Sequence, residues 1–248
     1  MPDTLSQYLR QYTTARVELG RTGVSLRTKE VLDFHLAHAQ ARDAVHTALD
    51  VAGLLHNLKQ RGLRSRLLKS AAADRYVYLR RPDLGRTLSP ESAAEISVAP
   101  CDIAFVIADG LSALAIDRHA LSLLDAVLPL LDSNSWKIGA MHVVEQGRVA
   151  IGDEIGERLQ AAIAVVLIGE RPGLSSPDSL GVYVTWAPRR GRTDAERSCI
   201  SNIRPEGLGY AEGARLLHGC LAEARNRKLT GVSLTSAIAA RPGRLHGF

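Results

Sequence analysis

The sequence predicts an α/β fold: an N-terminal helical domain, then a Rossmann-like, mostly parallel sheet with helices on both faces. In the first third of the chain, apolar residues recur at the three- and four-residue spacing of helices. After Pro100, short apolar runs alternate with helical stretches. Strands separated by helices are joined by crossover connections, which give parallel sheets. A chain of 248 residues, 46% of them apolar, can form a substantial core.

The helical domain is expected to span residues 1–92. Thr28 is placed to cap a helix over residues 29–50, and a second helix is expected over residues 52–63. The apolar stripe of the first helix is Val31, Phe34, His38, Ala41 and Val45, and that of the second is Leu54, Leu55, Leu58 and Leu63. Pro82 and Gly85 then break the helical pattern, so a boundary is expected between Gly85 and Pro100.

The Rossmann-like domain is expected to span residues 93–248. Its expected strands are 102–110, 137–145, 161–169, 181–188 and 231–235, and its expected helices are 111–131, 152–160 (capped by Asp153) and 209–228. In such sheets, ligands bind outside the carboxyl ends of the strands. Four loops should converge there: "ADGLS", "EQGRVA", "GERPGLSS" and "RSCISNIRPEG".

The loop "GERPG" after the strand at 161–169 admits two interpretations. It is either a solvated turn in which Pro172 fixes the backbone, or part of a ligand site. In the second case Glu170 accepts hydrogen bonds from the ligand, and Gly169 lets the ligand approach the backbone. Composition alone leaves both open.

Charge and composition exclude several classes of protein. The net charge is +5, and residues 1–92 hold 15 Lys and Arg against 9 Asp and Glu. No run of five like charges occurs and aromatics are few, so an acidic protein surface is a better partner than nucleic acid. No long apolar run predicts a membrane span or a signal peptide, so we expect a cytoplasmic protein. Three cysteines without C-x-x-C spacing favour reduced thiols.

The common nucleotide and hydrolase motifs are missing. The chain has no G-x-x-x-x-G-K-[ST] phosphate loop and no G-x-S-x-G elbow. The segment "GLGYAEG" from Gly207 has the wrong glycine spacing for a dinucleotide fingerprint and no strand before it. A self-sufficient nucleotide-binding enzyme is therefore the least favoured of three hypotheses.

Two histidine arrangements suggest ligand chemistry only weakly. "DRHALS" (Asp117 to Ser122) begins like the D-x-H-x-x-G box of some cobalamin proteins, but it lacks the glycine, so a helical surface His119 is preferred. His35 and His38, with Asp33 and Asp43 nearby, have helical spacing. Zinc takes three or four ligands of defined geometry, so partly buried, hydrogen-bonded histidines are the preferred interpretation and no metal site is predicted.

Cys199 in "RSCISN" is a candidate for packing or ligand contact. Arg197 could lower the pKa of its thiol and make it a nucleophile, but no histidine is close in sequence to act as a base. No catalytic residue is therefore predicted in this chain.

Seven motifs follow one another along the chain, and the similarity that they carry spans about Arg16 to Val232, almost the whole chain. They are "RVELGRTG", "DFHLAHAQARDAV", "YLRRPDLGR", "ADGLSALAI", "EQGRVAIGDEIGE", "LIGERPGLSSPDSLGVY" and "RTDAERSCISNIRPEGLGYAEGA". Their content and order resemble the small (light) subunit of ethanolamine ammonia-lyase. Several of the motifs are long, so the resemblance is specific.

The resemblance implies one half of a lyase that uses adenosylcobalamin to convert ethanolamine to acetaldehyde and ammonia. The large subunit of that family, a TIM barrel, holds the substrate, and the small subunit closes over the cobalamin in a hetero-oligomer. The cobalamin contacts then map onto Val149, Glu170 and Cys199. Val149 would supply apolar contact, Glu170 would accept hydrogen bonds from corrin amides, and Cys199 would allow close approach.

The resemblance also bears on location. Some members have a longer N-terminal extension associated with bacterial microcompartments, whereas here the matched region begins at about Arg16.

The second hypothesis is a non-catalytic α/β binding or assembly module, whose loops serve only a protein partner.

Overall fold

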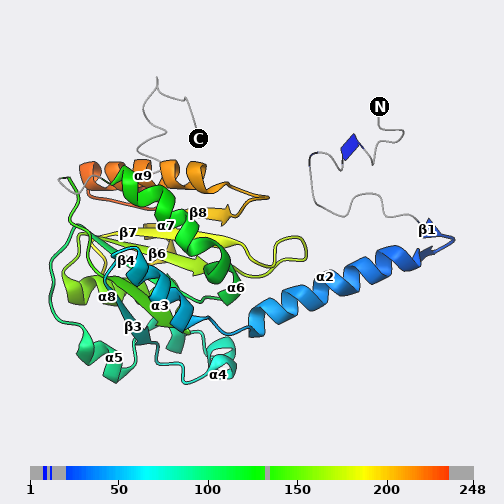
Figure 1. Cartoon of the computed structure of the whole chain (residues 1–248), viewed down its shortest axis with the longest axis horizontal. Coiled ribbons are helices and arrows are strands. Elements are labelled where there is room, and N and C mark those ends of the chain that lie inside the picture. The colour runs from blue at the N-terminus through cyan, green and yellow to red at the C-terminus, as the bar shows by residue number, and fades with distance from the viewer. Residues whose placement is uncertain (1–7, 10–11, 13–20, 132–134, 235–248) are drawn as a thin grey trace.

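The computed structural model describes residues 8–9, 12, 21–131 and 135–234. A six-stranded sheet forms its centre, with strand order β3-β5-β4-β6-β7-β8 (Figure 1). The strands are β3 Ser65–Lys69, β4 Ile103–Ala108, β5 Met141–Glu145, β6 Ile163–Gly169, β7 Leu180–Trp186 and β8 Ser198–Ile203. The first four in spatial order pair in parallel, while β7 and β8 add antiparallel pairings. The predicted α/β fold with a mostly parallel sheet is confirmed.

Helices lie on both faces of this sheet because its central strands are apolar on both sides. On one face, α3, α7 and α9 pack with Phe105 and Ile107; on the other, α8 packs with Val106 and Ala108. The helices are α2 Thr28–His46, α3 Val51–Gln60, α4 Arg75–Arg80, α5 Pro90–Glu95, α6 Ala113–Ala115, α7 Leu121–Val127, α8 Ile151–Leu159 and α9 Tyr210–Arg227. The π-helical turn Ile116–Ala120 joins α6 to α7.

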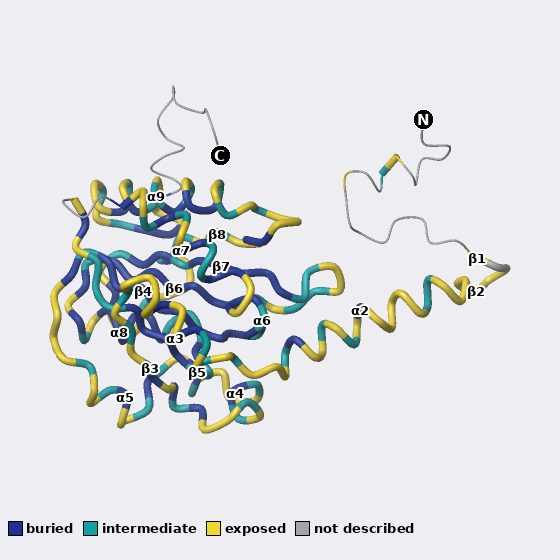
Figure 2. Tube along the Cα trace, viewed as in Figure 1, coloured by how far each residue is buried: buried dark blue, intermediate teal, exposed yellow. Residues whose placement is uncertain are grey.

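Helix α2 projects away from the sheet, and its outer end carries the two-residue strands β1 Arg21–Thr22 and β2 Ser25–Leu26 (Figure 1). Its burial differs from the prediction: only Ala37 and Ala44 are buried, whereas Phe34 of the expected stripe is exposed (Figure 2). Thr28 is the first helical residue rather than its cap. Periodicity alone predicted a packed face, but the described residues give the helix almost no neighbour to pack against.

Strand β3 was not expected from the sequence. It lies within residues 1–92, yet it pairs with β5 along its whole length. Helix α3 was predicted correctly, and its Leu54 and Leu58 are buried against the sheet. The domain division at residue 92 stays a prediction, with the qualification that α3 and β3 belong to the packing of the sheet.

Three further expectations are wrong. The segment containing Cys199 was expected to be a loop but forms strand β8. In the expected last strand, Gly231 is in a turn, residues 232–234 are helical, and residue 235 lies outside the described residues. Asp153 does not cap α8, because the cap position is Ala150; Asp153 instead pairs with Arg197.

Candidate functional site

Strands β4, β5 and β6 end together at one edge of the sheet, so the loops that follow them converge as predicted. Glu170 comes directly after β6, and Val149 lies between β5 and α8. Both line one cavity of about 280 Å³. The cavity is lined by Tyr78, Leu111, Arg148, Val149, Ile168, Gly169, Glu170, Arg171 and Tyr183. The structure therefore brings together two of the three predicted contact residues.

Glu170 is held in place by a set of hydrogen-bond donors. Its carboxylate accepts from the hydroxyls of Ser179 and Ser201, and from the backbone N–H of Asn202 at 3.2 Å. Its own backbone N–H donates to the Ser179 carbonyl at 2.9 Å. Since an ionised carboxylate has about four acceptor positions, one remains for a further donor. Glu170 is thus a fixed acceptor at the cavity wall.

Gly169 is required by the protein's own packing rather than by a ligand. A Cβ at this position would lie 1.9 Å from the Ser112 carbonyl oxygen and 2.7 Å from that of Asp109. The Gly169 carbonyl also accepts from the backbone N–H of Leu111 at 2.9 Å. Close contact between the ends of β4 and β6 therefore accounts for a glycine at this position, and ligand approach at Gly169 stays a prediction.

The loop that bears Val149 is anchored by Asp109, which follows β4. The Asp109 carboxylate accepts from the backbone N–H groups of Gln146 at 2.9 Å and Gly147 at 3.0 Å. Burial raises the pKa of Asp109 to about 6, although these hydrogen bonds and nearby Arg75 favour its charged form. Asp109 thereby fixes the position of the backbone just before Val149.

The ring of Tyr78 and the guanidinium of Arg148 form the part of the cavity wall next to Val149. The guanidinium carbon of Arg148 lies 4.2 Å from the centroid of the Tyr78 ring, and the Tyr78 hydroxyl donates to the Gly147 carbonyl at 3.2 Å. The Nε of Arg148 is buried and has no hydrogen-bond partner in the described part of the chain. Sequence reasoning missed Tyr78 and Arg148, which come from distant segments. Both residues lie in motifs that carry the family resemblance, Tyr78 at the start of "YLRRPDLGR" and Arg148 next to Val149, but the local pattern does not indicate that they meet at this cavity.

Cys199 lies beside this cavity rather than in its wall. It faces Tyr183 across the β7–β8 pairing, and Tyr183 does line the cavity. Ile200 packs with the core on the α9 side, so Cys199 and Ser201 point to the other face, where both are exposed. The described helices thus leave this face of β8 open, and it continues the cavity outward.

The thiol of Cys199 is not activated. Partial desolvation by neighbouring atoms raises its pKa, although the residue is exposed, and the charge of Glu170 also raises it. Arg197, the cation that could have lowered this pKa, is turned into the core and paired with Asp153 and Asp194. The structure gives no support to a nucleophilic role.

The histidine candidates also differ from expectation. His119 is helical but buried, not on the surface, and its Nδ1 lies 2.8 Å from the Tyr210 hydroxyl. His35 and His38 are exposed and make ring contacts with Phe34. In the described residues, no three His, Cys, Asp or Glu side chains are grouped as metal ligands would be.

Comparison with known proteins identifies the family of this chain. The family model for the ethanolamine ammonia-lyase light chain matches residues 3–235. The chain belongs to the ethanolamine ammonia-lyase light-chain family. It is 57% identical over 232 residues to the ethanolamine ammonia-lyase small subunit of Xanthomonas campestris, with 91% of this chain and 85% of that protein covered.

Two other members of the family are similarly close. The small subunit of Azotobacter vinelandii is 56% identical over 234 residues, which cover 92% of this chain and 87% of that protein. That of Pseudomonas aeruginosa is 55% identical over 232 residues, covering 91% and 85%. The resemblance inferred from the motifs is confirmed as family membership. No described helix of this light-chain family member is long and apolar enough to cross a membrane.

Proposed function

We propose that this chain is the small subunit of an adenosylcobalamin-dependent ethanolamine ammonia-lyase and closes the cobalamin site against a large subunit. The observation that carries the proposal is the shared cavity of Val149 and Glu170 at the carboxyl edge, next to the open face that bears Cys199. The relatives are named small subunits, so a large subunit is the expected partner. That subunit would supply the substrate site.

The size of the cavity fits a shared site. Pockets that enclose drug-sized ligands measure roughly 300–1,000 Å³, and a corrin is larger than such ligands. A cavity of about 280 Å³ can therefore receive only the edge of a corrin. The open face of β8 continues the same surface, so the remainder would be covered by the second polypeptide.

The residues present also fit the chemistry of a corrin edge, which carries amide side chains. Glu170 has one free acceptor position for an amide N–H, and its three present donors hold the carboxylate still. Val149 offers apolar contact, and Cys199 offers a small side chain on a flat strand. When bound, the cofactor would supply the radical chemistry of the lyase; this chain binds, orients and excludes water.

Co-expression with the large subunit from the same source tests the proposal. We expect a complex that copurifies with a cobalamin absorbance band and releases acetaldehyde from ethanolamine. In Glu170→Gln the complex should still form, with cobalamin affinity reduced about tenfold or more, because hydrogen bonds to a charged acceptor contribute roughly 1.5–3 kcal/mol. Glu223→Gln, which alters an acid on α9 at the other face, is the matched control.

The main alternative is a non-catalytic α/β assembly module. It predicts that the complex forms, yet cobalamin affinity is the same in wild type and in variants of Val149, Glu170 and Cys199. An unchanged affinity in Glu170→Gln, with an intact complex, would remove the proposed site.

Cytoplasmic or microcompartment location is part of the same proposal, and localisation of a tagged chain in its native host tests it.

A further inference from the structure

A second cavity lies at the opposite edge of the sheet, where the parallel strands begin. Its volume is about 530 Å³. Its walls come from the start of β3, from residues 137–142 leading into β5, and from residues 96–101 leading into β4. Nothing in the proposed cobalamin site uses this edge, which is separated from Glu170 by the length of the strands.

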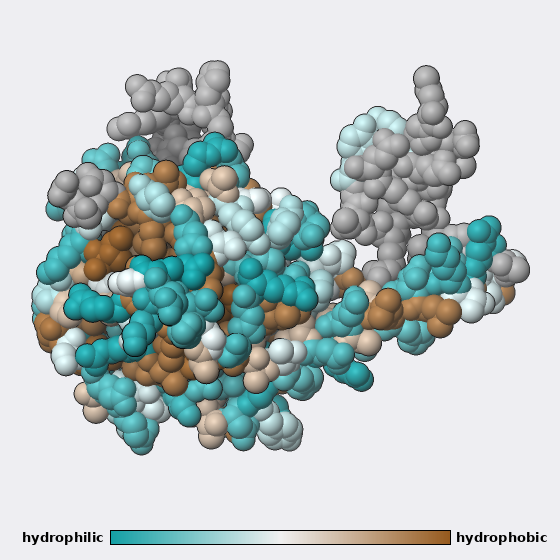
Figure 3. Space-filling model, viewed as in Figure 1, coloured by the Kyte–Doolittle hydropathy of each residue, from teal (hydrophilic) through white to brown (hydrophobic). Residues whose placement is uncertain are grey.

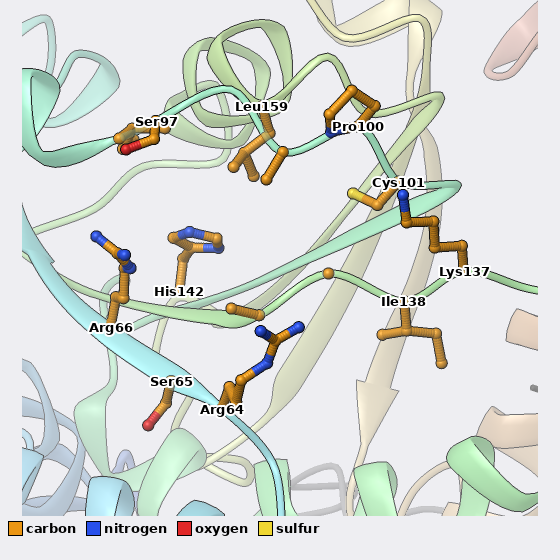
Figure 4. A pocket seen from close by; sticks show the side chains of 14 residues that line it. Arg64, Ser65, Arg66, Ser97, Pro100, Cys101, Lys137, Ile138, His142 and Leu159 are labelled. Carbon is orange, nitrogen blue, oxygen red and sulfur yellow. The ribbon is translucent and has the colours of Figure 1, made fainter.

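Three cations border this cavity: Arg64, Arg66 and Lys137, called here the cation group. Figure 4 shows them around the hollow, with Arg66 beside His142 on one side, Arg64 between, and Lys137 on the other side near Cys101. In the described ranges, none of the three forms an ion pair with a carboxylate; Arg66 donates only to the Glu95 backbone carbonyl, at 3.1 Å. Asp102 accepts from the backbone N–H of Lys137 and lies 3.6 Å from Arg225. The cation group thus carries positive charge that the described chain does not neutralise.

His142 adds a buried polar group to the same hollow. It is the register partner of Arg66 on the neighbouring strand, so the two side chains stand side by side on one face of the sheet (Figure 4). The residue is 2% exposed, and its Nδ1 has no hydrogen-bond partner in the part of the chain that the structure describes. Buried polar atoms without partners are uncommon in native proteins and call for an explanation.

The imidazole is neutral at physiological pH. Burial, together with the charge of Arg66, lowers the pKa of His142 to about 4. His142 therefore provides a hydrogen-bonding nitrogen without adding charge. It occupies a strand position whose same-face neighbour, Val144, is in the apolar core. Packing alone would favour an apolar side chain there.

The other side of the cavity is apolar. Ile96, Pro100 and Leu159, called here the apolar wall, face the cation group across the hollow. Figure 4 shows Leu159 and Pro100 opposite Arg64 and His142. A ligand that fits would have a charged end and an apolar body.

We propose that this cavity binds a small organic phosphate, with the phosphate group near Arg64, Arg66 and His142 and the organic part against the apolar wall; Lys137 adds positive charge from the other side of the hollow. Guanidinium groups bind phosphate oxygens with paired hydrogen bonds, and lysine adds a point charge. A phosphate monoester carries close to two negative charges at neutral pH, which balances three cations better than the single charge of a carboxylate.

Calorimetric titration of the full-length chain with phenyl phosphate tests the proposal. We expect saturable binding at one site, weaker binding of inorganic phosphate because it lacks the apolar body, and no binding of phenol. Arg66→Gln/Lys137→Gln replaces two exposed cations and should weaken phenyl phosphate binding at least about tenfold. Ser97→Trp, at the exposed rim, should block the cavity without any change in charge.

The control variant Arg215→Gln/Lys228→Gln removes the same charge from two exposed positions, one in α9 and one just after it. It should leave phenyl phosphate binding unchanged. The proposal is overturned if the probe does not bind, or if both double variants lose affinity equally. Equal affinity for benzoate would overturn the assignment to phosphate. These outcomes are independent of cobalamin binding, because the large subunit and the cofactor are absent from the titration.

Discussion

Arg197 and Asp153 form an ion pair whose side chains are only 2% and 3% exposed. The pair joins the residue before β8 to the first turn of α8. Cys199 lies two residues after Arg197, and Val149 lies four residues before Asp153. One buried contact thereby links the two segments that flank the candidate cobalamin cavity.

Breaking this pair should destabilise the protein. We expect Arg197→Met to lower the free energy of unfolding by about 3–5 kcal/mol, because Asp153 would be left buried without its counter-ion. The double variant Arg197→Met/Asp153→Leu should lose less, since a buried pair replaced by apolar residues is often nearly neutral. Urea unfolding measures both. A single variant as stable as wild type would contradict the burial of the pair.

Two glycines near Glu170 should respond differently to alanine. Gly169→Ala places a Cβ 1.9 Å from the Ser112 carbonyl oxygen, so the backbone must shift. This should lower the free energy of unfolding by about 1–3 kcal/mol. At Gly181→Ala the three nearest atoms to the new Cβ all belong to the Glu170 side chain, with 2.8 Å to its Oε1. This variant should leave thermal stability nearly unchanged and weaken cobalamin binding in the complex. Equal thermal shifts in the two variants would contradict this distinction.

Asp109 should give the protein a specific dependence of stability on pH. Its ordinary pKa of 3.8 applies to the unfolded chain, and burial raises the pKa to about 6 in the folded one. The folded state therefore binds this proton more tightly. The contribution of Asp109 is fully present below pH 4 and is lost as the pH rises through 6, by about 3 kcal/mol in total.

The variant Asp109→Asn cannot ionise, so it isolates this effect. Relative to Asp109→Asn, the wild type should lose unfolding free energy as the pH rises from 4 to 6.5. Urea unfolding at several pH values gives that difference. A difference that stays constant over this range would show that the pKa of Asp109 is not raised.

Cys199 should be the first of the three cysteines to be alkylated in the isolated chain. It is exposed, whereas Cys101 is buried and Cys220 is intermediate. Because its pKa is raised, labelling by iodoacetamide should be slow at pH 7 and rise about tenfold per pH unit below that pKa. Peptide mass spectrometry identifies the site. In the complex with cobalamin, the proposed contact predicts protection of Cys199; unchanged labelling there would count against that contact.

Helix α2 shows where sequence patterns failed. Its three- and four-residue spacing correctly predicted a helix, but not what the helix packs against. Leu32 and Leu36 are 62% and 60% exposed, and Figure 3 shows apolar surface along the projecting helix. Periodicity reports that a segment can form a helix with an apolar side; whether that side is covered depends on other parts of the chain or on a partner.

By itself, the sequence determined the α/β class, the four strands β4 to β7 and the family. Continuous apolar runs such as 163–168 must be buried on both faces, and long motifs in a fixed order identify a family without any structure. It also indicated that Val149 and Glu170 converge, because strands of a parallel sheet end at one edge.

Only the tertiary structure decided the rest. It placed β3 at the edge of the sheet, made Cys199 part of a strand, turned Arg197 into the core, and brought Tyr78 under the loop of Val149. It also set His142 beside Arg66 at the opposite edge. These relationships join residues tens of positions apart, and their energies come from burial and charge pairing across that distance. Local sequence patterns contain no record of such contacts.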